Sequence, residues 1–160
     1  MLRNVAVVLV NSFLPFEFGT ICEVFGVDRA DDGLPSYDFA VVAGESPPLR
    51  ATVDFTISPA CGLERLAEAD LIALPAVGDD RLGRSAGQAE LPTGWPGRPA
   101  GPPGFPEDLL EALRRAITRG AKILSVCSGA FILGEAGLLD GRRCTTHWRH
   151  AAELARRKPA

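Results

Sequence analysis

The sequence predicts a single α/β domain over residues 1–160, with a doubly wound and mostly parallel sheet. Short apolar runs without polar alternation recur along the chain, as expected of parallel strands that are covered on both faces. Stretches with apolar residues at helical spacing separate these runs, and parallel strands need such crossover connections. A length of 160 residues, with 46% hydrophobic and 23% charged residues, fits one globular domain.

The first part of the chain is expected to form a strand, a helix and a second strand. Residues 5–10 are an apolar run rich in β-branched side chains, which is typical of a buried strand. This run spans only about six residues, so it is too short for a secretory signal or a membrane span. Apolar residues at three- and four-residue spacing predict a helix over about residues 17–27, and residues 37–43 supply the next strand.

The middle of the chain adds an edge element, a short helix and another buried strand. Residues 53–57 alternate apolar and polar side chains, which favours a half-exposed strand or hairpin arm at the edge of the sheet. Residues 63–69 can form a short helix, and residues 70–75 are a further buried strand. Between about residues 77 and 106 the composition shifts to Gly, Pro, Arg and Ser, which predicts a long mobile surface loop inside the same domain.

A helix and a strand then lead to the most informative segment. Glu107 and Asp108 begin the helix, where acidic residues complement the dipole, and Gly120 ends it. Residues 121–126 form the next strand. In open parallel sheets the binding sites lie beyond the carboxyl ends of the strands, so we expect the functional residues to follow these strands.

Cys127 follows this strand directly, and small residues open the helix that comes next and ends near Gly137. The order of strand, nucleophile, small residues and helix is typical of a nucleophile elbow. The amides and dipole of a helix N-terminus would favour a thiolate over a thiol at this position. A buried structural cysteine is the alternative interpretation.

Glu17 and His147 are the other candidate site residues. Glu17 comes just after the first strand, so it is expected at the same edge of the sheet as Cys127. Its alternative role is that of an acidic residue in the first turn of a helix. His147, one of two histidines, is a candidate base or pocket residue, or else an ordinary polar side chain.

The net charge and the spacing of the cysteines argue against several kinds of binding partner. A net charge of −3 gives no attraction to phosphates or anionic membranes, so we expect no nucleic-acid contact by this segment and no membrane association. The four cysteines lack zinc-site spacing and indicate reduced thiols in a cytoplasm. Cys144 and His147 offer two ligands at most, so neither a metal nor another cofactor is expected. Arg156, Arg157 and Lys158 are interpreted as a helix C-terminus that complements the dipole, with a DNA contact as the alternative.

Four short segments carry a more specific pattern. They are Pro15-Phe16-Glu17-Phe18-Gly19 with Cys22-Glu23-Val24-Phe25-Gly26, then Ser125-Val126-Cys127-Ser128-Gly129-Ala130-Phe131, then Ala136-Gly137-Leu138-Leu139-Asp140-Gly141-Arg142-Arg143, and Thr145-Thr146-His147-Trp148. This pattern resembles the class-I glutamine-amidotransferase-like superfamily of the DJ-1/PfpI type. Within it, the chain is similar to the N-terminal sensor domain of AraC-family (FtrA/GlxA-like) transcription regulators.

The resemblance implies a flavodoxin-like sheet and a pocket shared by Glu17, Cys127 and His147, with Ser128 and Gly129 also lining it. It implies a small-molecule effector and a homodimer that pairs through helices near the site. Hydrolytic members place a histidine directly after the elbow cysteine, whereas this chain has Ser128, whose hydroxyl cannot take up a proton at neutral pH. The resemblance therefore favours ligand sensing over catalysis.

Relatives continue with further strands and a paired helix-turn-helix module that reads DNA. We therefore expect this chain to be a sensor domain with C-terminal strands missing and no helix-turn-helix domain. The alternative function is that of a small cysteine-dependent enzyme of the same superfamily, an isonitrile-hydratase-like lyase or a glyoxalase-like hydratase that uses Glu17 and Cys127. A decayed relic or a pure dimerisation module is a third interpretation.

Overall fold

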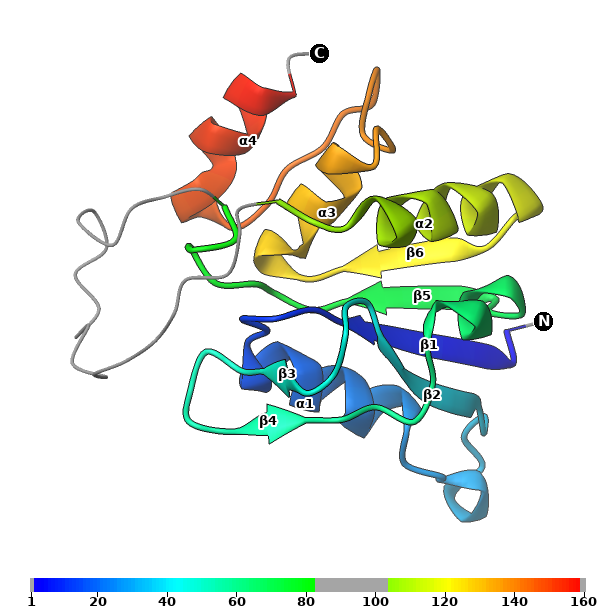
Figure 1. Cartoon of the computed structure of the whole chain (residues 1–160). Coiled ribbons are helices and arrows are strands. Elements are labelled where there is room, and N and C mark those ends of the chain that lie inside the picture. The colour runs from blue at the N-terminus through cyan, green and yellow to red at the C-terminus, as the bar shows by residue number, and fades with distance from the viewer. Residues whose placement is uncertain (1, 83–103, 159–160) are drawn as a thin grey trace.

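A computed structural model describes residues 2–82 and 104–158 (Figure 1). Within these ranges four parallel strands form one sheet in the order β2-β1-β5-β6. Their bounds are Asn4–Leu9 for β1, Asp38–Ala43 for β2, Leu71–Leu74 for β5 and Lys122–Ser125 for β6. This arrangement confirms the predicted mostly parallel α/β fold. The central part of the expected loop, residues 83–103, lies outside the described residues.

Helices cover both faces of the sheet, as a doubly wound fold requires. One face carries α1 (Pro15–Phe25) and a hairpin of β3 (Leu49–Arg50) and β4 (Thr56–Ile57). The other carries α2 (Glu107–Arg119), α3 (Ala130–Glu135), α4 (Ala151–Arg157) and the 3₁₀ turn η2 (Leu63–Ala67). The first crossover helix and the later ones lie on opposite faces, so the topological switch point of the sheet lies between β1 and β5.

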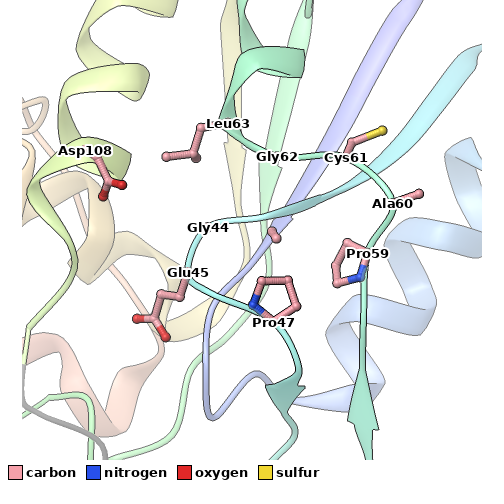
Figure 2. A pocket seen from close by; sticks show the side chains of 10 residues that line it. Gly44, Glu45, Pro47, Pro59, Ala60, Cys61, Gly62, Leu63 and Asp108 are labelled. Carbon is pink, nitrogen blue, oxygen red and sulfur yellow. The ribbon is translucent and has the colours of Figure 1, made fainter.

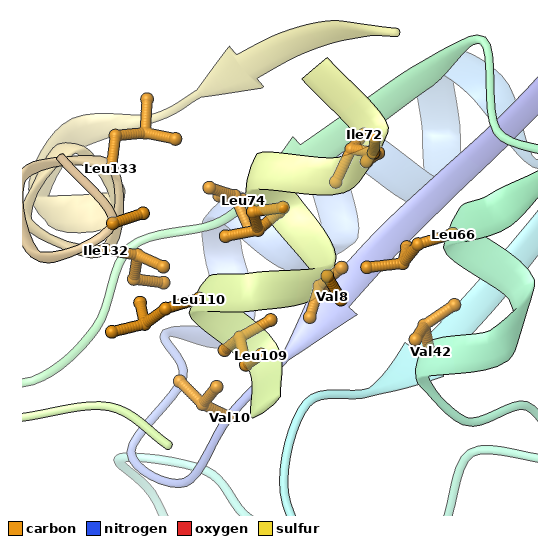
Figure 3. Close-up of a cluster of buried hydrophobic side chains, with 14 of the residues drawn as sticks. Val8, Val10, Val42, Leu66, Ile72, Leu74, Leu109, Leu110, Ile132 and Leu133 are labelled. Atoms are coloured by element: carbon orange, nitrogen blue, oxygen red, sulfur yellow. The ribbon is translucent and has the colours of Figure 1, made fainter. Parts of the chain in front are cut away.

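The larger hydrophobic core lies between the sheet and α2 and α3 (Figure 3). In it, Val8 of β1 and Leu74 of β5 pack toward Leu109 and Leu110 of α2 and Ile132 of α3. Full burial of each such side chain stabilises the fold by about 1.5–3 kcal/mol. Successive side chains of β1 point to opposite faces of the sheet, and Val7 faces the second core beneath α1. Because both faces are covered, the sequence of β1 is apolar without interruption.

Several predicted elements have different bounds. The helix expected from residue 17 begins two residues earlier at Pro15, because proline at the first helical position has a suitable φ and no N–H to satisfy. The strand expected over residues 53–57 at the edge of the sheet is confined to Thr56–Ile57. It pairs with β3 in a separate two-stranded sheet, and the side chains of Val53 and Phe55 stay exposed. The helix expected over residues 63–69 is the shorter 3₁₀ turn η2.

No helix in the described ranges has the length and apolar character needed to cross a membrane.

Candidate functional site

Cys127 lies on a sharp turn between strand β6 and helix α3. The preceding Val126 is still extended, with φ −113° and ψ 131°, whereas Cys127 has φ 53°. A positive φ is uncommon for a residue with a Cβ and is costly unless the surroundings impose it. A 3₁₀ turn, η3 (Cys127–Gly129), then leads into α3. The backbone therefore has the strand-to-helix elbow that the sequence predicts.

Gly129 allows the elbow to pass close to the neighbouring strand. A Cβ at this position would lie 2.5 Å from the carbonyl oxygen of Leu74 and 2.9 Å from that of Pro75. A larger side chain would push the elbow away from the end of β5. Thr146 holds the other side, since its hydroxyl donates to the Cys127 carbonyl at 2.6 Å.

The Ser128 hydroxyl is buried and is engaged by the backbone of a single residue. Its Oγ accepts from the Val77 amide at 2.9 Å and donates to the Val77 carbonyl at 2.7 Å. Ser128 thus joins the elbow to the segment after β5. In this arrangement the hydroxyl is a structural link rather than a base for Cys127.

Glu17 and Cys127 lie close enough for the carboxylate charge to act on the thiol. Burial is the main cause that raises the pKa of Cys127. Hydrogen bonds from the amide and the hydroxyl of Ser128 oppose it, and the charges of Glu17 and Asp79 raise it further. The expected preference for thiolate is therefore wrong, because burial and two carboxylates outweigh the hydrogen bonds from Ser128. The Oε2 atom of Glu17 is buried and has no hydrogen-bond partner among the described residues.

His147 does not lie against the thiol in any contact that the structure shows. Its ring is exposed and lies at a tilt of 36° to that of Trp148, and its Nδ1 accepts from the Arg149 amide at 3.3 Å. The buried histidine is His150, whose Nε2 lies 3.6 Å from Oδ1 of Asp79. Sequence reasoning did not select His150 or Asp79.

Residues 77–82, which we name the hub segment, connect the ends of four elements. Besides the contacts of Val77 and Asp79, Asp80 accepts from the hydroxyl of Ser12, after β1, at 2.5 Å. Arg81 forms a buried ion pair with Glu45, after β2, and Arg157 of α4 donates to the Leu82 carbonyl. These six residues were expected in a mobile surface loop, which is wrong, because long-range polar contacts hold them. The buried apolar residues Val77 and Leu82 were the available sequence signal.

A cavity of about 320 Å³ lies elsewhere, at the carboxyl end of β2 (Figure 2). Figure 2 shows the carboxylates of Glu45 and Asp108 on one side of it and Pro59 and Ala60 on the other. The lining does not include Cys127, Glu17 or His147. A ligand pocket around Cys127 stays a prediction.

Among the described residues, no group of three or more His, Cys, Asp or Glu side chains is arranged to hold a metal ion.

Comparison with known proteins places this elbow in a family. The profile of the DJ-1/PfpI family matches residues 96–159. An uncharacterized protein in the cpoL 5′ region of Streptomyces lividans is 38% identical over 124 residues, which cover 78% of this chain and 74% of that protein. The chain belongs to the DJ-1/PfpI family. The segment that matches the family includes Cys127, which lies on the predicted elbow.

Two further relatives of this DJ-1/PfpI chain differ in their descriptions. Isonitrile hydratase of Pseudomonas putida is 26% identical over 117 residues, or 73% of this chain and 42% of that enzyme. The HTH-type transcriptional regulator GlxA of Rhizobium meliloti (strain 1021) is 52% identical over 42 residues, or 26% of this chain and 13% of the regulator. Each match spans less than half of the relative's own length.

Solved structures confirm the fold of this DJ-1/PfpI domain. A putative transcriptional regulator protein from Vibrio parahaemolyticus has a TM-score of 0.73 and 15% identity, over 99% of this chain and 74% of that one. An AraC family transcriptional regulator from Pseudomonas putida has a TM-score of 0.63 and 20% identity, over 98% and 73% of the two chains. At such low identity these likenesses show the fold alone.

Proposed function

We propose that this DJ-1/PfpI domain is the non-catalytic, ligand-sensing part of an AraC-type transcription regulator. Its small-molecule effector would bind beside Cys127 and Glu17 in the cytoplasm. The observation that carries the proposal is the hydrogen bonding of the Ser128 hydroxyl. This residue stands where hydrolytic members have a base, and its hydroxyl is held from both sides by the backbone of Val77. A nucleophilic cysteine without a base nearby is poorly activated.

The surroundings of Cys127 support a sensor in two further ways. Burial and the charges of Glu17 and Asp79 raise the pKa of the thiol, which lowers the thiolate fraction at neutral pH. His147 is exposed and has its Nδ1 engaged by the Arg149 amide, so it does not replace the missing base. Similarity to the regulator GlxA favours transcriptional control as the output.

Two measurements test the sensor function. First, the purified chain is incubated with cyclohexyl isocyanide or methylglyoxal, and loss of each compound is followed by NMR. We expect no more loss than with the Cys127→Ser variant. Second, the DNA beyond codon 160 is sequenced, and a helix-turn-helix coding region is expected there. Turnover that requires Cys127, or the absence of such a region in every frame, contradicts the proposal.

A cysteine-dependent enzyme is the second candidate, favoured by the match to isonitrile hydratase and by the closeness of Glu17 to Cys127. It predicts consumption of the isocyanide that disappears in both Cys127→Ser and Glu17→Gln. Cys144→Ser is the matched control, since Cys144 is exposed and lies outside the elbow. Equal rates in the native chain and in Cys127→Ser rule out this candidate.

We also infer a homodimer formed through α1. The outer side of this helix carries two large apolar side chains beside the polar Thr20 and Glu23, since Phe16 is 81% and Val24 is 55% exposed. Large apolar side chains that lie together on an exposed surface favour an interface with a partner. Gly19 lies on the outer side with open space around it, which allows a second helix to approach closely. The occupant that fits best is α1 of a second copy, because twofold homodimers are the commonest assemblies.

A further inference from the structure

The cavity at the carboxyl end of β2 is built by three segments that are far apart in the sequence. They are the end of β2 with the residues that follow it, the stretch from Pro59 to Leu63, and the first turn of α2 (Figure 2). The volume of about 320 Å³ is at the lower end of the range for small-molecule sites. A compact molecule in this cavity would therefore contact all three segments.

The walls of the cavity are mainly apolar. They include the rings of Pro47 and Pro59 and the side chains of Ala60 and Leu63. Leu63 is half-buried, whereas Pro47 and Ala60 are exposed. Because contact with apolar walls releases water from apolar surface, this lining favours a molecule with a compact hydrocarbon body over a hydrated ion.

The charged side chains in the lining are both acidic. They are Glu45 and Asp108, and the described residues that line the cavity include no lysine, arginine or histidine. Within the described ranges Asp108 forms no ion pair. Its Oδ1 accepts from the Leu109 amide at 2.9 Å, so the positive end of α2 already faces a carboxylate. The second oxygen, Oδ2, is left for a ligand.

The balance of charge around the cavity is negative. Glu45 is neutralised by its buried ion pair with Arg81, so Asp108 sets the sign of the charge in the lining. Glu64 adds a third carboxylate beside it, because its Oε1 accepts from the amide of Gly62, a lining residue, at 2.8 Å. A cation in the cavity would therefore meet opposite charge, and an anion would meet like charge.

We propose that this cavity is a second binding site, which takes a small organic cation: a protonated amine on a compact apolar body. The ammonium group would lie against Asp108, and the hydrocarbon part would lie against Pro59 and Leu63. An ammonium group donates up to three hydrogen bonds, and carboxylate oxygens accept them. The site goes beyond the proposed sensor function, because it lies away from Cys127 and does not depend on what binds there.

Three probes that share one ring test the proposal. Benzylamine is a cation at pH 7, benzyl alcohol is neutral and similar in size, and benzoate is an anion. NMR titration of the isotope-labelled chain gives the affinity for each probe and shows which amides shift. The shifts should be centred on Gly44, Gly62, Leu63 and Asp108, which line the cavity.

The affinities should follow the charge of the probe. We expect benzylamine to bind with a millimolar dissociation constant. Benzyl alcohol should bind about three- to fivefold more weakly, since an exposed ion pair contributes only a modest amount. Benzoate should bind about tenfold more weakly than benzylamine, because it meets like charge.

Two variants assign the preference to the charge of the lining. Asp108→Asn keeps the side-chain shape, so benzylamine should bind about three- to fivefold more weakly while benzyl alcohol binds as before. Ala60→Lys places a cation in the lining without touching α2, and it should abolish the preference for benzylamine. Asp31→Asn is the matched control and should change neither affinity, since Asp31 is exposed on the 3₁₀ turn Ala30–Asp32 outside the cavity.

Several results would overturn the proposal. Equal affinities for benzylamine and benzyl alcohol, or a preference that survives in both variants, overturn the assignment of a cation. Shifts centred on other residues overturn the site, and the absence of binding by all three probes overturns both. None of these results changes the outcome of the isocyanide and methylglyoxal assays, so the sensor function is tested separately.

Discussion

At the scale of single residues, the elbow depends on the absence of a side chain at Gly129. We predict that Gly129→Ala lowers the free energy of unfolding by about 2–3 kcal/mol, because the added Cβ would lie 2.5 Å from the Leu74 carbonyl oxygen, a backbone atom. Urea unfolding followed by circular dichroism measures the change. Gly134→Ala is the control: its Cβ would lie 3.5 Å from the nearest atom, in the flexible side chain of Lys158, so helix propensity should leave stability unchanged or raise it by about 1 kcal/mol. Equal losses in both variants would contradict the steric argument.

The Cys127 thiol is the second feature at this scale. Because burial and the charges of Glu17 and Asp79 raise its pKa, the rate of iodoacetamide labelling should rise at higher pH than for an ordinary thiol. Glu17→Gln removes a negative charge, so the thiolate becomes less costly and the midpoint of the rate profile should move to lower pH. The profile is measured by mass mapping of Cys127. A midpoint that is unchanged in Glu17→Gln would show that this charge does not reach the thiol.

At the scale of elements, the hub segment (residues 77–82) is joined to the elbow mainly by Ser128. We predict that Ser128→Ala lowers the free energy of unfolding by about 2 kcal/mol, because it leaves the amide and carbonyl of Val77 buried without their partner. Chemical unfolding measures the loss. The control is Ser36→Ala, which removes an exposed hydroxyl bound only to Asp28 and should change stability by less than about 0.5 kcal/mol. A Ser128→Ala protein as stable as the control would show that the hub segment is held by its other contacts.

Helices and strands were predicted correctly where a pattern in consecutive residues specifies them. The apolar run of β1, the helical stripe of α2 and the left-handed cap at Gly120, with φ 104°, are each visible in consecutive residues. The hub segment was missed because its partners are remote: Ser128 lies 51 positions from Val77. Composition assigned these residues to a surface loop, and only the fold supplies the contacts that bury them.

At the scale of the whole molecule, the outer side of α1 governs assembly. Val24→Glu should convert the inferred dimer to a monomer, because it places charges on both sides of a twofold interface. Size-exclusion chromatography with light scattering measures the mass. Leu34→Glu is the matched control, since Leu34 has a similar exposure of 54% but lies outside α1. A native chain that is monomeric at high concentration, or a dimer that survives in Val24→Glu, contradicts an interface through α1.

The sequence alone determined the fold class, the order of most elements and the position of the Cys127 elbow. These features depend on hydrophobic periodicity, on proline and glycine and on a short motif, all of which act over neighbouring residues. The tertiary structure alone decided which acid joins Glu17 at the thiol, which histidine is buried, and that the thiol pKa is raised. The burial of a site and the charges around it depend on residues from segments that are far apart in the chain. Both are therefore set only when those segments pack together.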